Sequence, residues 1–84
     1  MNCTATYALL DSGGAELETS KAGIKLAQAT LCVAPQSGSP LLFSLRDIAR
    51  VEHKGYTARL SLRTGEQLLL SELGYKFEDF LRLL

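Results

Sequence analysis

The chain has 84 residues, 46% of them hydrophobic, and its nine basic and nine acidic residues give a formal net charge of zero. A chain of this length can bury about 60% of its unfolded surface, so one core and one domain over residues 1–84 are expected. The balanced charge produces no overall field that would attract nucleic acid or an anionic membrane. Any such partner would need a local patch of one sign.

No segment has the character of a membrane span or a secretory leader. The longest apolar runs are as short as Leu68–Leu70, whereas roughly 20 residues are needed to cross a bilayer. Met1 is not followed by a basic region and an apolar stretch, as a secretory signal would require. A cytoplasmic location is therefore expected. The ending on Leu83 and Leu84, with no polar tail, suggests a module of a longer chain.

The first part of the chain predicts short strands separated by turns. Thr4–Leu10 is rich in β-branched, aromatic and aliphatic residues and ends at Asp11–Gly14, a strong turn signal. Ala15–Thr19 alternates in polarity, which predicts a hairpin with the first strand. Ser20–Gly23 is expected to break the chain before a third strand that begins at Ile24.

The middle of the chain predicts two more strands and a bend. Leu31–Val33 is a continuous apolar run, and Pro35–Pro40 is the clearest loop in the sequence, read as a connection between strands. Leu41–Leu45 then alternates in polarity until Asp47–Arg50 interrupts the pattern. A bend or bulge is expected at this interruption.

The next segments have the clearest strand signals. Val51–His53 resumes the alternation, and Tyr56–Arg63 is the cleanest period-two segment, as expected of a strand with one wet face. Thr64–Gly65 predicts a tight hairpin in which glycine supplies the positive φ, and it leads to a final strand over Glu66–Ser71.

From Tyr75 onward the hydrophobic period becomes helical. Phe77, Phe80, Leu81 and Leu84 share one face of the expected helix. A helix this short is not stable alone, so its apolar stripe is expected to plug one end of a small β-barrel or a strongly bent sheet. The polar face would consist of Lys76, Glu78, Asp79 and Arg82.

Three stretches in this order carry a family resemblance: Pro40–Glu52, Tyr56–Ser71 and the Phe-x-x-Phe pattern of Phe77–Leu81. Together they resemble the second half of a pleckstrin-homology-like domain of the PH/GRAM type, and Gly23–Val33 is similar to the strands that lead into that half. The resemblance implies a mainly β fold, a partly open barrel of about seven antiparallel strands capped by one C-terminal α-helix. It also implies a binding module for phosphoinositides, peptides or proteins rather than an enzyme.

Lipid-binding members of that family cluster lysine and arginine in and beside the first hairpin. Here Asp11–Gly14 is followed by Glu16 and Glu18, the wrong sign for a polyanion. The basic residues lie in the second half instead, and the candidate site for an anionic partner consists of Arg46, Arg50, Arg59 and Arg63. The alternative for Arg59 and Arg63 is a solvated strand face that discourages edge-to-edge pairing.

Catalytic and metal-binding patterns have little support. His53 is the only histidine, and neither a second imidazole nor a cysteine lies near it in sequence. A triad with Asp47 and a serine is formally possible, but no Gly-x-Ser-x-Gly motif accompanies it. Cys3 and Cys32 are too few for a disulfide framework, and we expect them to be free, with a single bridge as the alternative. No enzyme activity, metal or cofactor is expected.

Two functions from different classes follow. The first is a non-catalytic interaction or scaffolding module that binds a protein partner or self-associates, because Leu41–Phe43 and Leu68–Leu70 place apolar residues on both strand faces. The second is peripheral binding of anionic lipid headgroups through the four arginines of the candidate site. Nucleic acid is not an expected partner, because no strand is both basic and rich in aromatic residues.

Overall fold

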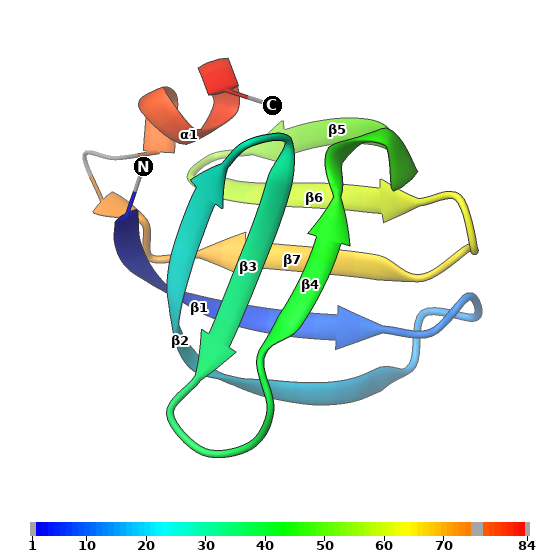
Figure 1. The fold of residues 1–84 in the computed structure, drawn as a ribbon. Helices are drawn as coiled ribbons and strands as arrows, with labels where there is room; N and C mark the ends of the chain where they lie inside the picture. The colour runs from blue at the N-terminus through cyan, green and yellow to red at the C-terminus, as the bar shows by residue number, and fades with distance from the viewer. Residues whose placement is uncertain (1, 75–76, 84) are drawn as a thin grey trace.

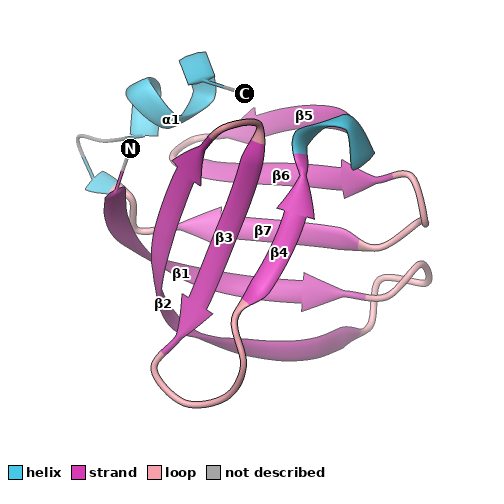
Figure 2. Cartoon of the chain, in the orientation of Figure 1, coloured by secondary structure: helices cyan, strands magenta, loops and turns pink. Residues whose placement is uncertain are grey.

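The computed structural model describes residues 2–74 and 77–83 and shows a single antiparallel sheet curled into a half-barrel, with a short helix at one end (Figure 1). The seven strands lie in the order β4-β3-β2-β1-β7-β6-β5. Figure 2 shows a short 3-10 helix, η1, where β4 leads into β5. The elements are β1 (Asn2–Leu10), β2 (Glu16–Ala27), β3 (Thr30–Pro35), β4 (Leu41–Ser44), η1 (Leu45–Asp47), β5 (Ile48–Lys54), β6 (Thr57–Leu62), β7 (Gln67–Ser71) and α1 (Phe77–Leu83).

The predicted fold class is confirmed: mainly β, with seven antiparallel strands in a partly open barrel and a C-terminal helix. The half-barrel exists because the strands alternate, so that every second side chain points to one shared interior. In β1, Ala5 and Tyr7 are buried while Thr4 on the other face is exposed. The buried core consists of Ala5, Tyr7, Ala22, Ile24, Leu26, Leu31, Val33, Ala58, Leu60, Leu68, Leu70, Leu73 and Phe80.

The expected break at Ser20–Gly23 is wrong, because β2 is one continuous strand of 12 residues. Its first half pairs with β1, the stretch from Ala22 to Lys25 pairs with both β1 and β3, and its last two residues pair with β3. Figure 1 shows β2 curving from one layer of the half-barrel into the other. Gly23 lies within this strand, opposite Thr4 on one side and Ala34 on the other. Glycine in a strand permits a tight bend, so here it marks curvature and not an end.

The turn between β2 and β3 was not predicted. Ala27 pairs with Thr30, which leaves a two-residue turn of Gln28 and Ala29, with φ values of 53° and 60°. Two successive positive φ values are the type I′ geometry, which usually selects Asn-Gly. The turn is also tied to the second half of the chain, because the Leu45 N–H donates to the Ala29 carbonyl at 2.9 Å.

The bend predicted at Asp47–Arg50 is present and has two parts. The 3-10 helix η1 turns the chain first, and the register between β5 and β6 then shifts between Ile48 and Arg50, as at a β-bulge. The Arg63 N–H donates to the Asp47 carbonyl at 2.9 Å, which holds the bend against the end of β6.

Two predicted turns are confirmed, and they lie against each other. The Asp11 carboxylate accepts hydrogen bonds from the Gly13 and Ala15 N–H groups at 2.9 and 2.8 Å, an arrangement that closes the β1–β2 hairpin. Gly65 has φ 101° in the β6–β7 hairpin, where a Cβ atom would also approach the Ser12 Cβ atom to 3.1 Å. Both constraints explain glycine at this position.

The helix α1 covers one end of the half-barrel (Figure 1). Phe80 has no exposed surface and belongs to the core, and Leu81 is half-buried against it. Glu78, Asp79 and Arg82 are exposed, as the polar face requires. The predicted plug is therefore confirmed for Phe80 and Leu81. The side chain of Phe77 and residues Tyr75, Lys76 and Leu84 fall outside the described part.

Phe80→Ala should lower the free energy of unfolding by about 3–5 kcal/mol, because it leaves a cavity where the helix meets the core. Urea denaturation followed by circular dichroism measures this change. Glu78→Ala, on the exposed face of the same helix, is the control and should stay within about 0.5 kcal/mol of the wild type. Equal stability of the two variants would contradict the packing of Phe80.

Ala29→Gly should raise the free energy of unfolding by about 0.5–1 kcal/mol, because glycine adopts positive φ without a steric penalty. Thermal melting measures the difference. The matched control is Ala27→Gly, the same change in an exposed residue of β2, which should be destabilising because a strand interior loses backbone entropy with glycine. Loss of stability in both variants would show that the turn geometry is wrong.

Candidate binding surface

The four predicted arginines are all exposed, and the structure places them in two neighbouring groups. In the β5–β6 pair, Arg50 lies opposite Ser61 and Glu52 opposite Arg59. These residues point away from the core, since Ala58 and Leu60 on the other face of β6 are buried. Arg50 and Arg59 thus share one surface, which we call the β5–β6 outer face and which consists of Arg50, Glu52, Lys54, Thr57, Arg59 and Ser61.

The other two arginines lie at the adjoining corner, beside η1. The Arg63 Nε–H donates to the Arg46 carbonyl at 2.7 Å, so this guanidinium group braces the bend. Arg46 itself lies within η1. The structure therefore places Arg50 and Arg59 on one strand face and Arg46 and Arg63 at the bend beside it, where the Arg63 side chain is already used in a hydrogen bond to the backbone.

The β5–β6 outer face also has a cation that was not among the predicted site residues, Lys54, and an anion at its centre, Glu52. Lys54 lies opposite Thr57 and follows the same alternation as Arg50 and Glu52. Its period-two spacing is the signal that could have identified it. The Arg50 guanidinium and the Glu52 carboxylate form an ion pair at 3.8 Å, with side chains 70% and 53% exposed. Such an exposed pair contributes little to stability.

The half-barrel has exposed apolar side chains near its open edges. Val51, on β5, is 40% exposed although its register places it on the inner face, opposite Leu60. This exposure arises because β4 and β5 are the two ends of the sheet and are not paired with each other. Leu42 on β4 is 69% exposed, and Tyr56 in the β5–β6 turn is 74% exposed.

A shallow hollow lies beside the β5–β6 turn, between this turn and α1. Tyr56 and Leu81 are its apolar members, and charged side chains of the helix form its rim. The hollow adjoins the C-terminal end of β5. It is lined by His53, Gly55, Tyr56, Glu78, Leu81 and Arg82.

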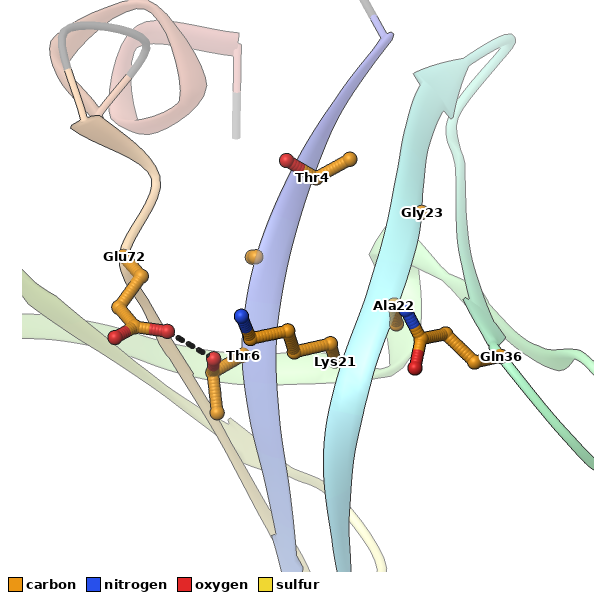
Figure 3. Close-up of a pocket in the computed structure, with 8 residues that line it drawn as sticks. Thr4, Thr6, Lys21, Ala22, Gly23, Gln36 and Glu72 are labelled. Atoms are coloured by element: carbon orange, nitrogen blue, oxygen red, sulfur yellow. Dashed lines mark hydrogen bonds between the residues drawn. The ribbon is translucent and has the colours of Figure 1, made fainter.

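A second hollow lies on the outer surface of β1 and β2 (Figure 3). Lys21 runs from β2 across β1 toward Thr6, and Glu72 lies on the far side of that threonine. The Thr6 hydroxyl donates to the Glu72 carboxylate. One cation beside one anion does not form the cationic cluster that a polyphosphate headgroup requires.

The buried phenol of Tyr7 has a structural role. Its side chain is 2% exposed, and its hydroxyl donates to the Glu18 carboxylate at 2.9 Å. Burial, followed by this hydrogen bond and the charge of Glu18, raises the pKa of Tyr7 above its usual value of 10.0. The folded state thus holds the proton more tightly than the unfolded state, and this contribution to stability is lost as the pH rises above 10.0.

Asp47 and His53, the two residues considered for a catalytic triad, lie in different elements, η1 and β5. His53 lies near the end of β5 and lines two hollows there, and Asp47 in η1 is not among the residues that line them. No group of three or more His, Cys, Asp or Glu side chains within residues 2–74 and 77–83 could hold a metal ion. Cys3 pairs with Ile24 and Cys32 pairs with Lys25, so the two cysteines lie on opposite faces of the sheet and do not face each other.

The chain was compared with family models, curated proteins and solved structures, and none of the three comparisons gave a match. In the described residues, no helix has the length and apolarity that a bilayer crossing requires.

Proposed function

We propose that this chain is a non-catalytic protein-interaction module of PH-like fold. The family resemblance of residues 40–81 supports the fold, as does the arrangement of seven antiparallel strands with a helix over one end. A single curled sheet with this strand order places β1 beside β7 and leaves β4 and β5 at its two ends. The chain then acts through its surface, by binding another polypeptide.

The open edge of β5 carries this proposal. An edge strand presents unpaired backbone groups and readily pairs with a further strand. On β5 this edge lies next to exposed apolar side chains, Val51 on the strand and Tyr56 in the following turn. Apolar surface beside a free edge supplies both the hydrogen bonds and the area that strand addition needs.

Self-association is the one form of protein binding that can be tested with this chain alone. Sedimentation velocity from micromolar to submillimolar concentrations should give a sedimentation coefficient that rises with concentration, because mass action populates the associated species. Leu42→Thr, on the opposite edge strand β4, tests whether β4 is the contact instead; it should leave the rise unchanged. A sedimentation coefficient that is the same at every concentration would overturn self-association.

A second candidate, binding of anionic lipid headgroups, is favoured by the placement of Arg50, Arg59 and Lys54 on one outer face. The chain should then co-sediment with vesicles that contain phosphatidylserine at low salt and stay in the supernatant at high salt. Arg59→Glu should weaken binding at least about fivefold, since each cation near the surface contributes about 1 kcal/mol. Lys25→Glu, the same charge change on β2, is the control. Binding that is absent at low salt would remove this candidate.

A further inference from the structure

The strand β5 is the longer of the two edge strands of the half-barrel. β4 has four residues and β5 has seven. Within the described chain, β5 is hydrogen-bonded to β6 on one side and ends the sheet on the other. Its bulge lies near its start, between Ile48 and Arg50, so the stretch from Arg50 to Lys54 is regular. A regular strand with an open side is a template for pairing.

The direction of the backbone groups on β5 follows from its hairpin. Lys54 and Thr57 are opposite each other and enclose the two-residue turn of Gly55 and Tyr56. Residues that flank such a turn form a hydrogen-bonded pair, and hydrogen-bonded and non-hydrogen-bonded pairs then alternate along the strands. Arg50 and Glu52 therefore bond toward β6, whereas the N–H and C=O of Val51 point to the open edge.

The charged side chains on either side of Val51 are complementary in charge to those of a second copy in antiparallel orientation. Arg50 precedes Val51 and Glu52 follows it, and both charged side chains are on the outer face. We propose that two copies of the chain pair antiparallel through β5, centred on Val51. Arg50 of each copy then faces Glu52 of the second copy, and the two Val51 residues exchange backbone hydrogen bonds at the two-fold axis. This inference rests on the proposed function and assigns its partner, a second copy of this chain.

Charge selects this register over the neighbouring ones. Residues that face each other across an antiparallel pair must lie on the same face, so the centre of a two-fold pairing falls on a residue. Centring on Glu52 would place Glu52 against itself and Arg50 against Lys54, which are like charges at short range. Centring on His53 would pair only the last part of the strand. The Val51 centre joins opposite charges twice, through Arg50 and Glu52 of the two copies.

Burial favours the same arrangement. Val51 is 40% exposed in the single chain, and at the two-fold axis it meets its own counterpart. A two-fold axis perpendicular to the sheet keeps the outer faces of both copies on one side, so the two sheets continue into one. Twofold dimers of this isologous kind are the most common symmetric assemblies.

Two charge variants test the pairing, each first checked for cooperative thermal unfolding. Arg50→Glu places two acidic residues opposite each other at both ends of the axis, and Glu52→Arg places two basic ones there. Each variant alone should dimerise at least about tenfold more weakly than the wild type in sedimentation equilibrium. An equimolar mixture of the two should recover wild-type affinity as a heterodimer, because every cross-copy pair is again of opposite charge. Lys25→Glu, away from β5, is the control and should dimerise normally.

Amide hydrogen exchange gives a readout of the backbone itself. As the concentration of wild-type chain rises, exchange at the Val51 amide should slow, while exchange at the Glu52 amide, which bonds to β6, should not change. Wild-type association that persists unaltered in both charge variants would overturn the β5 pairing and leave the proposed function standing. Association that is lost in each variant and not recovered in the mixture would also overturn it. A wild-type chain that is monomeric throughout would overturn the β5 pairing together with self-association, and would leave only binding of a different polypeptide as the proposed function.

Discussion

Burial of one face of a single sheet determines the rest of this structure. A flat sheet of this size would need a second layer to cover its apolar side, and the chain is too short to supply a full one. The sheet therefore curls until its own strands cover each other, with Leu31 and Val33 of β3 and Leu60 and Leu68 of the facing strands all fully buried. The curl leaves one end open, and α1 fills that end with Phe80.

The same curl explains where the open edges of the sheet lie. A sheet that closes completely has no edges, whereas this one stops at β4 and β5. Apolar side chains at the last strand are then covered on one side only, which is why Val51 combines an inward direction with substantial exposure. The unpaired backbone groups of β5 and the exposed side chain of Val51 lie together because the sheet ends at this strand. A partner bound at this edge would bury the part of Val51 that the chain itself leaves exposed.

Local sequence patterns predicted much of the fold. The alternation in Tyr56–Arg63, the Thr64–Gly65 turn and the apolar spacing of Phe80 and Leu81 each correspond to an observed element, because period and turn chemistry act within a few residues. Gly23 misled the prediction because glycine serves both turns and bent strands. The Gln28–Ala29 turn was missed because its residues adopt a conformation that is unfavourable for them and is imposed by the pairing of Ala27 with Thr30.

The candidate surface was only partly predictable. The four arginines could be chosen as basic and exposed, and all four are exposed in the structure. The sequence could not show that Arg50 and Arg59 share the β5–β6 outer face while Arg46 and Arg63 lie at the bend. The hydrogen bond from Arg63 to the Arg46 carbonyl links residues that are far apart in sequence. The open edge of β5 could not be predicted at all, because which strand ends a sheet is decided by the order of all the strands.

The pairing of β1 with β7 has a consequence for how this chain folds. Thr6 lies opposite Ser71, so residues near the two ends of the chain are neighbours in the middle of the sheet. The hairpins on either side can form early from local contacts, but the strand pair that unites them must close a loop of most of the chain. We therefore expect the pairing of β1 with β7 to form late and to be the slow step of folding. Until it occurs, the two halves are separate ribbons, each with an additional exposed edge.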